Sequence, residues 1–293
     1  MTRPPAGPDL AGWRRAVLSY GRCSLRPLPW RATRDPWAVL VSEFMLQQTQ
    51  AARVVAPYLA FLDRFPTPAA AAAAGVGAVV SQWAGLGYNR RALSLHRAAQ
   101  DVTERFGGSV PDDLASLRSL PGVGPYTARA VLAFAFERPV GVVDVNVARV
   151  LQRAVAGAAL ADGPAQELAD AMVPARRSWD WNQSVMEIGA VFCRARGPRC
   201  DGCPLAGRCR WNARGRSGTD PAARGVRQPA FEGSDRQGRG RLVAALRAGP
   251  VRPGQVAAAC GWPDDPERAR RVADGLVADG LSRRARGGTL VLP

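Results

Sequence analysis

Hydrophobic residues recur at a helical spacing through most of the chain before residue 212. The first two stripes are formed by Leu10, Trp13, Val17 and Leu18, and by Trp37, Leu40, Val41, Phe44 and Met45. Side chains three or four residues apart share one face of a helix, so each stripe predicts an amphipathic helix with a buried side. Asp9, Thr67 and Asp112–Asp113 stand where helices would begin and can cap free N–H groups. Because alternating strand patterns are nearly absent, the sequence predicts a mostly α-helical fold from Asp9 to about Trp211.

The pattern changes after residue 212. The next stretch is rich in Gly, Ser, Arg, Asp and Pro and contains few large apolar residues, which indicates a linker. Beyond it, residues 241–247, 255–260 and 267–280 return to helical spacing, and residues 287–291 can form a strand or hairpin, an order typical of a small winged-helix-like module. The predicted division is residues 1–34 with 141–212, residues 35–140, a linker at 213–239 and a C-terminal module at 240–293.

Composition indicates a globular and strongly basic protein. The chain has 293 residues, of which 47% are hydrophobic, enough for the cores of about two domains. Its net charge is +16 and its pI is about 11.2, which favours a polyanionic partner, above all nucleic acid. A basic surface that only contacts solvent is the alternative. The sequence contains no lysine, so all 40 basic residues are arginine.

Several classes of protein are excluded by what the sequence lacks. No apolar segment of a secretory signal follows the N-terminus, and the most apolar stretch, residues 69–80, is too short to span a bilayer. We therefore expect a cytoplasmic, bacterial protein without a membrane partner, and we expect it to be a monomer. His96 is the only histidine, which argues against Ser-His-Asp or Cys-His catalysis and against histidine-rich metal sites.

Four of the six cysteines form a compact C-x6-C-x2-C-x5-C array at Cys193, Cys200, Cys203 and Cys209. In a reducing compartment, such an array favours metal ligation over disulfide bonds. A zinc ribbon usually has two C-x2-C pairs, whereas one pair flanked by two single cysteines suits a 4Fe-4S cluster better. Structural zinc and unligated core cysteines are the alternatives. A cationic surface that binds phosphates is predicted by the arginines around the array, Arg194, Arg196, Arg199, Arg208, Arg210, Arg214 and Arg216.

A glycine-rich turn, Leu120-Pro121-Gly122-Val123-Gly124-Pro125-Tyr126-Thr127-Ala128, joins two stretches with helical patterning. Glycines allow a close approach of the backbone to another chain, and the N–H groups that open the second helix can bind an anion. We therefore predict that Gly122, Val123 and Gly124 contact one DNA phosphate. An ordinary turn between helices that binds nothing is the alternative.

Two carboxylates have contrasting surroundings in the sequence. Glu43 lies among apolar residues of a predicted helix, so its pKa should be raised and it can act as a general acid. Asp144 precedes a predicted helix as its N-cap, where the positive helix end should keep it ionised. A general acid paired with an ionised carboxylate is what cleavage of a glycosidic bond requires. The alternatives are a Glu43 on a solvated helix face and an Asp144 that only caps its helix.

The cysteine array and the turn together resemble the helix-hairpin-helix DNA glycosylase superfamily, which contains endonuclease III. Three further stretches resemble its MutY-type adenine glycosylases: residues 28–31 (LPWR), residues 42–50 (SEFMLQQTQ) and residues 85–88 (GLGY). The resemblance covers roughly residues 9 to 212. It implies a helix-hairpin-helix glycosylase fold with a 4Fe-4S cluster loop, and removal of adenine mispaired with 8-oxoguanine or guanine in double-stranded DNA. The adenine would be extruded from the duplex, because its glycosidic bond cannot be reached inside the stack.

The resemblance also implies roles for individual residues. Glu43 would donate a proton to the flipped adenine, Asp144 would stabilise the sugar C1′, and Tyr126 and Asn146 would position these groups. The base pocket would be lined by Arg26, Leu28, Trp30, Arg31 and Glu187. Contacts within the duplex would come from Gln48, Thr49, Leu86 and Tyr88.

Strand cleavage is not expected from this protein. Superfamily members that cut the strand carry a lysine at the position of Tyr126, and this chain has no lysine that could form a Schiff base. The chain departs from the MutY-type pattern in two places: the part after the linker is too short for a Nudix-like domain, and Asn89 replaces a second tyrosine. Two alternatives remain, a thymine glycosylase acting on T:G mismatches and a non-catalytic iron-sulfur DNA-binding regulator.

Overall fold

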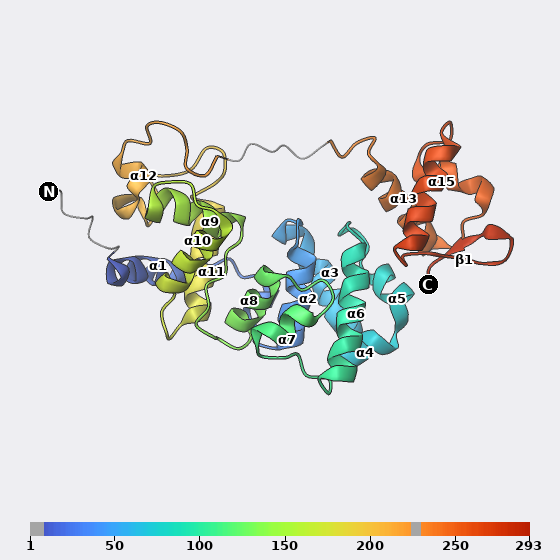
Figure 1. Ribbon diagram of the computed structural model, residues 1–293, viewed down its shortest axis with the longest axis horizontal. Coiled ribbons are helices and arrows are strands. Elements are labelled where there is room, and N and C mark those ends of the chain that lie inside the picture. The colour runs from blue at the N-terminus through green and yellow to red at the C-terminus, as the bar shows by residue number, and fades with distance from the viewer. Residues whose placement is uncertain (1–8, 224–229) are drawn as a thin grey trace. The chain divides into compact units, whose positions relative to one another are not determined.

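The computed structural model describes residues 9–223 and 230–293. The described chain is mostly helical, as predicted, and its one sheet is an antiparallel pair of two-residue strands. It packs into two compact units, described in turn below (Figure 1). Within the described residues, no helix combines the length and apolar character needed to cross a bilayer.

Unit 1 consists of residues 9–36 and 125–223. Its helices are α1 (Leu10–Ser24), α8 (Pro125–Phe134), α9 (Val145–Val150), α10 (Asp162–Met172), α11 (Ser178–Val191) and α12 (Arg210–Ala213), with a short helical turn at Pro29–Arg31 and a π-helical continuation of α9 at Leu151–Ala156. Asp9 caps α1 as predicted, because its carboxylate accepts a hydrogen bond from Gly12 N at 2.9 Å. The core forms where α1 and α9 pack on α11, with Trp13, Val147, Trp181 and Ile188 all buried.

Unit 2 begins with residues 37–124. These form α2 (Pro36–Leu46), α3 (Ala51–Arg64), α4 (Pro68–Ala73), α5 (Gly75–Gln82), α6 (Arg90–Arg105) and α7 (Leu114–Ser119). The predicted caps are confirmed at Thr67 and Asp113, whose side chains accept from Ala70 N and Ser116 N. Helix α6 lies against both α4 and α5 (Figure 1), and Phe61 and Trp83 meet edge to face in the core.

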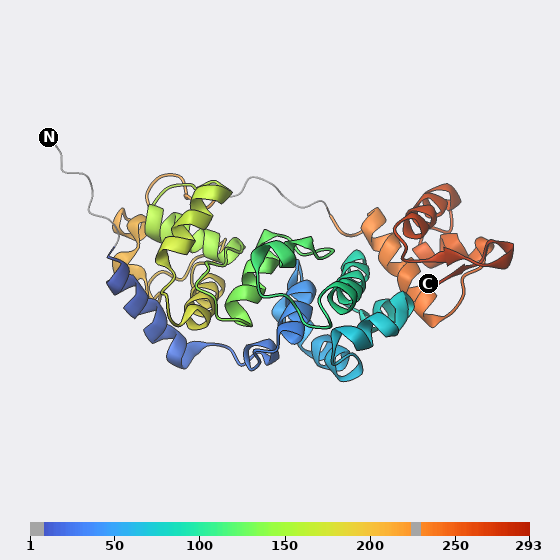
Figure 2. The same ribbon diagram turned by 60° about the horizontal axis from the view of Figure 1, so that its bottom comes forward.

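The C-terminal module, residues 230–293, also belongs to unit 2. It contains α13 (Asp235–Ala248), α14 (Val256–Cys260), α15 (Pro266–Ala278) and the strands β1 (Arg283–Arg284) and β2 (Leu290–Val291). Figure 2 shows the same helices turned by 60°. Three helices followed by a hairpin is the predicted order. Helix α13 starts inside the predicted linker, because Ser234 caps it by accepting from Gln237 N; residues 224–229 of that linker lie outside the described residues.

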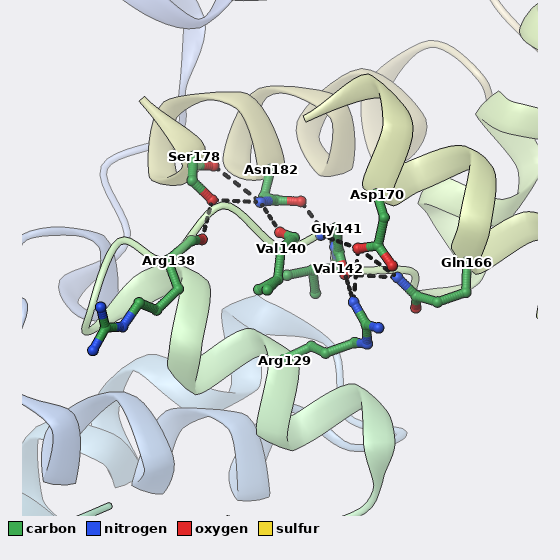
Figure 3. Close-up of polar contacts among 9 residues, drawn as sticks. All are labelled: Arg129, Arg138, Val140, Gly141, Val142, Gln166, Asp170, Ser178 and Asn182. Carbon is green, nitrogen blue, oxygen red and sulfur yellow. Dashed lines mark hydrogen bonds and ion pairs between the residues drawn. The ribbon is translucent and has the colours of Figure 1, made fainter. Parts of the chain in front are cut away.

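The packing divides the chain differently from the predicted boundaries. Residues 125–140, which the sequence analysis grouped with residues 35–124, pack in unit 1. Two contacts hold this stretch to unit 1: Arg129 of α8 donates to Asp170 of α10, and Asn182 of α11 donates to Val140 O (Figure 3).

Candidate functional site

Asp144 caps α9 in the geometry that the sequence predicts. Its Oδ1 accepts hydrogen bonds from Asn146 N at 2.9 Å and Val147 N at 2.7 Å, and its Oδ2 accepts from Asn146 Nδ2 at 2.6 Å. Burial raises the pKa of Asp144 above its usual value, although these hydrogen bonds oppose that shift. The positive helix end alone predicted an ionised Asp144. The structure adds a desolvation cost, which raises the pKa of Asp144 more than its hydrogen bonds lower it.

The extended segment before Asp144 is held by side chains that replace strand partners (Figure 3). Asn182 on α11 accepts from Val142 N at 2.9 Å and donates to Val140 O at 3.0 Å. On the α10 side, Asp170 accepts from Gly141 N at 2.8 Å. The main chain leading to Asp144 is therefore fixed from both α10 and α11, which limits the movement of the carboxylate.

Arg149 links Asn146 to the cysteine loop. Its Nη2 donates to Asn146 Oδ1 at 2.8 Å and to Gly189 O at 2.9 Å, and its Nε donates to Cys193 O at 2.5 Å. A side chain on Gly189 would come within 2.7 Å of Asn146 O, so glycine allows α9 to pack closely on α11. This contact orients the Asn146 amide, whose other end donates to Asp144.

Glu43 lies in the middle of α2 and is only 4% exposed. Every residue of α2 from Trp37 to Met45 is buried, so this helix has no solvated face and the alternative of a solvent-facing Glu43 is wrong. Burial among apolar side chains favours the neutral form of a carboxyl group. Glu43 belongs to unit 2, whereas Asp144, Tyr126 and Asn146 belong to unit 1.

Three of the predicted pocket residues form an ionic cluster in unit 1, in which Glu187 is buried, the Arg31 side chain is 9% exposed and Arg26 is exposed. The Glu187 side chain is 1% exposed and pairs with Arg31 at 2.7 Å and with Arg26 at 2.5 Å. Burial acts to raise the pKa of Glu187, but the two guanidinium groups outweigh it and hold that pKa below its usual value. Trp30 is buried and Leu28 is half-buried. These ion pairs place Glu187, on α11, beside residues that follow α1 in the sequence.

Two loops of unit 2 carry the residues predicted to enter the duplex. Gln48 and Tyr88 are exposed and adopt left-handed backbone conformations, with φ of 55° and 46°. Such conformations are uncommon for residues other than glycine and require support from their surroundings. Thr49 is half-buried, and Leu86 is buried at 3% exposure, so of these four residues only Gln48 and Tyr88 are exposed in this structure.

Arg91, at the start of α6, provides that support and was not identified from the sequence. Its Nη1 donates to the carbonyl oxygens of Phe44, Met45 and Gln47. Its Nη2 donates to Thr49 Oγ1, Leu86 O and Gly87 O, each at 3.1 Å. Burial lowers the pKa of Arg91 to about 10, so it stays charged at neutral pH. One guanidinium therefore ties both loops together.

The glycine-rich turn places two backbone positions at the surface directly before α8. Gly122 has φ of 80°, and a side chain there would come within 2.8 Å of the Phe44 ring. Gly124 has open space around it, and both glycines are exposed while Val123 is buried. The turn thus has the bare backbone that an approaching phosphate would need.

The four cysteines of the array line a single cavity in unit 1. Phe192, Pro198 and Trp211 contribute the apolar part of its wall, and Arg153 closes it. No three metal-ligating side chains in the described part of the chain converge on one point that a single ion could occupy. The four thiols share one cavity with an apolar wall, and thiolate ligands around such a cavity would fit an iron-sulfur cluster.

Arg153 is the second buried arginine that the sequence did not single out. Its side chain is 1% exposed, donates to Cys193 Sγ at 3.6 Å and pairs with Asp220. Burial alone would lower its pKa, but Asp220 and Cys193 raise that pKa. Arg153 therefore places a permanent positive charge beside the thiols. The seven arginines predicted to form a cationic surface around the array are all exposed.

Comparison with known proteins identifies the family. Residues 41–172 match the model described as HhH-GPD superfamily base excision DNA repair protein. An adenine DNA glycosylase of Mycobacterium tuberculosis is 44% identical over 285 residues, covering 94% of this chain and 92% of that protein. The chain belongs to the adenine DNA glycosylase family.

Two solved structures of DNA-repair proteins are similar to this chain in their fold. A thermostable thymine-DNA glycosylase is 28% identical, with a TM-score of 0.66 and coverage of 70% of this chain and 97% of that chain. A trapped endonuclease III–DNA covalent intermediate is 23% identical, with a TM-score of 0.61 and coverage of 71% and 99%, and it supports the fold alone.

The Mycobacterium tuberculosis relative shares at least part of the C-terminal module with this adenine DNA glycosylase family member. The alignment leaves 6% of this chain uncovered, fewer residues than the 54 between positions 240 and 293. The alignment must therefore reach into the module, which the sequence analysis treated as a departure from the MutY-type pattern.

Proposed function

We propose that this protein removes adenine mispaired with 8-oxoguanine or guanine in double-stranded DNA and leaves an abasic site. The observation that carries the proposal is a pair of carboxyl groups in different settings: Glu43 is buried in the middle of α2, and Asp144 accepts three hydrogen bonds at the start of α9. The 44% identity to an adenine DNA glycosylase favours adenine as the base.

The reaction that these groups support is hydrolysis with general acid catalysis. As the general acid of this proposal, Glu43 donates its proton to N7 of the extruded adenine. The C1′–N9 bond then breaks, and its electron pair leaves with the base. Asp144, as an anion, stabilises the positive charge that develops on the sugar. Water then adds to C1′ and its proton passes to the Glu43 carboxylate, which restores the acid. Asn146 is a positioning residue, because it donates to both oxygens of Asp144.

The base and the duplex would be bound by the residues that the resemblance implies. In this proposal the extruded adenine lies near the cluster of Arg26, Arg31 and Glu187, with Leu28 and Trp30 supplying apolar contact. Gln48, Thr49, Leu86 and Tyr88 contact the duplex at the vacated position. The Gly122–Gly124 turn binds a phosphate, because its backbone N–H groups can approach closely.

Cys193, Cys200, Cys203 and Cys209 would hold a 4Fe-4S cluster in the cavity that they line. When bound, the cluster supplies a rigid closure of the loop. DNA binding would come from the chain itself: the seven exposed arginines around the array would form a cationic surface for DNA phosphates.

A second candidate is a thymine glycosylase for T:G mismatches. The structural likeness to a thymine-DNA glycosylase, at 28% identity, is the observation that favours it. Glu43 and the sequence Gln47-Gln48-Thr49 favour adenine instead, since both belong to the MutY-type pattern.

Single-turnover base release separates the candidates. Duplexes carrying A opposite 8-oxoguanine, A opposite G, and T opposite G are incubated with excess enzyme, and abasic sites are revealed by alkali. We expect release of adenine and none of thymine. Preferential thymine release would favour the second candidate, and no release from any duplex would favour a DNA-binding regulator. Glu43→Gln should abolish adenine release while duplex binding survives. Near-normal release would show that Glu43 is not the proton donor.

A further inference from the structure

Three consecutive residues after the Leu86 loop contact the C-terminal module. Arg236 Nη1, at the start of α13, donates to the Tyr88 hydroxyl at 2.7 Å. Arg247 Nη2, near the end of α13, donates to Asn89 Oδ1 at 3.0 Å. Arg90 pairs with Asp279, directly after α15, at 3.4 Å. Each residue of the segment 88–90 therefore contacts a different residue of the module: Arg236, Arg247 or Asp279.

The contact at Tyr88 involves the ring as well as the hydroxyl. The Arg236 guanidinium lies 5.5 Å from the Tyr88 ring centre and 5.0 Å from the ring of Phe231, which is 54% exposed. Arg91 lies 5.5 Å from the Tyr88 ring. Two cations thus lie close to the Tyr88 ring, and a charged donor on its hydroxyl fixes the direction of the ring.

The contact at Asn89 is the best-buried of the three. Asn89 is 9% exposed, and Arg247 also donates to Val80 O from Nε at 3.1 Å and from Nη2 at 2.9 Å. The side chain of Asn89 supplies the oxygen that Arg247 requires, which a tyrosine side chain at this position could not supply in the same place. The two departures from the MutY-type pattern, Asn89 and the short module, therefore meet in one contact.

From this arrangement we propose that Arg236 is a positioning residue for Tyr88, and that the direction in which it holds the Tyr88 ring affects how well the enzyme distinguishes the base opposite adenine. The proposal rests on the proposed function, in which Tyr88 contacts the duplex at the position that the extruded adenine leaves, next to the base opposite it. Tyr88 has a left-handed backbone and an exposed side chain, so without Arg236 its ring can take several directions. A freely moving ring would still fill space in the duplex but would distinguish 8-oxoguanine from guanine less well.

The test compares single-turnover rates of adenine release opposite 8-oxoguanine and opposite guanine. Arg236→Ala is expected to lower the ratio of these rates about fivefold, the effect of one partly exposed charge-assisted hydrogen bond. Arg241→Ala is the matched control, since it removes the same charge from an exposed position of α13 that does not contact Tyr88. It should leave the ratio unchanged. Arg236→Lys, which keeps a cationic donor, should restore part of the ratio.

A double-mutant cycle checks that Arg236 acts through the Tyr88 hydroxyl. Tyr88→Phe should lower the ratio as Arg236→Ala does, and the double variant should lower it no further. An active enzyme whose ratio is the same in Arg236→Ala and Arg241→Ala would overturn the role of Arg236. Wild-type protein that releases no adenine from either duplex would overturn the proposed function itself, and this role with it.

Discussion

Asn146 binds both oxygens of the Asp144 carboxylate, donating from its backbone N to Oδ1 at 2.9 Å and from Nδ2 to Oδ2 at 2.6 Å. Asp144 in turn caps α9, so the same carboxylate stabilises a helix end and, in the proposed function, stabilises the charge on the sugar. Substitutions can separate these two tasks, since an amide keeps one acceptor oxygen but loses the charge.

Asp144→Asn is expected to lower adenine release by at least about a hundredfold, the usual cost of removing one group that stabilises charge in a transition state. The asparagine oxygen can still accept from Asn146 N and Val147 N, so the fold and duplex affinity should persist. Single-turnover rates and gel-shift affinities measure the two effects. A rate within tenfold of wild type would show that the charge is not needed.

The pH dependence of adenine release should report the burial of Asp144. Because burial raises its pKa above the ordinary 3.8, the carboxylate gains a proton at a higher pH than an exposed aspartate would. The rate should therefore fall on acidification through a pKa above 3.8. A rate that stays constant down to pH 4, with the fold intact by circular dichroism, would contradict this assignment.

Glu187→Gln tests the ionic cluster. It leaves the Arg31 side chain, 9% exposed, without its anion, and we expect a loss of about 3 kcal/mol in the free energy of unfolding. The pKa of Glu187 is lower in the folded protein, so its stabilisation is present above the ordinary 4.5 and is lost as pH falls through the folded value. The difference between wild type and variant should therefore shrink below pH 4.5. Urea unfolding at several pH values measures it, and a constant difference would be inconsistent with an ionised Glu187.

The absence of lysine makes a prediction about strand cleavage. With no side-chain amine to attack C1′, borohydride should trap no covalent adduct between wild-type protein and substrate DNA. Tyr126→Lys supplies an amine at the position where strand-cutting members of the superfamily carry lysine, and it serves as the positive control. Trapping of wild-type protein in high yield would mean that another nucleophile acts.

Arg153→Met should reduce the content of the proposed iron-sulfur cluster. The variant loses the donor to Cys193 Sγ and the cation beside the thiols, and it leaves Asp220 without its partner. Iron and sulfide per chain, and the rate at which visible absorbance bleaches in air, measure the effect. Arg199→Met is the control, because Arg199 is exposed on the same loop. Equal cluster content in both variants would rule out a supporting role for Arg153.

The parts of the fold that the sequence predicts are those fixed by neighbouring residues. Asp9, Thr67, Asp113 and Asp144 all cap helices as predicted, because each accepts from an N–H two or three residues away. Helix α13 was predicted to begin too late, since its cap at Ser234 lies in a stretch whose composition indicated a linker.

The parts that the sequence does not predict depend on contacts between distant positions. Arg91 binds carbonyl oxygens 44 to 47 residues away, and Arg153 binds Asp220 across 67 residues. In a chain with 40 arginines, nothing local distinguishes these two from the exposed ones. The raised pKa of Asp144 has the same origin, because the groups that bury it come from the fold.

Asn182→Ala tests whether the segment before Asp144 positions the carboxylate. The change leaves the buried Val142 N–H and the Val140 carbonyl without the partners that a strand would provide (Figure 3). We expect a loss of about 2–3 kcal/mol in the free energy of unfolding. Adenine release should also slow by about tenfold or more, because displacement of a catalytic group by a fraction of an ångström weakens its contact with the transition state.

Gln166→Ala is the matched control for this change. It removes the hydrogen bonds from Gln166 Nε2 to Gly141 O at 3.0 Å and to Asp170 Oδ1 at 3.3 Å, while Asp170 can still accept from Gly141 N. The control should cost about 1 kcal/mol or less and leave the rate unchanged. If Asn182→Ala lost stability but kept the wild-type rate, the segment would have a structural role only, since Asp144 would then hold its position through α9 alone.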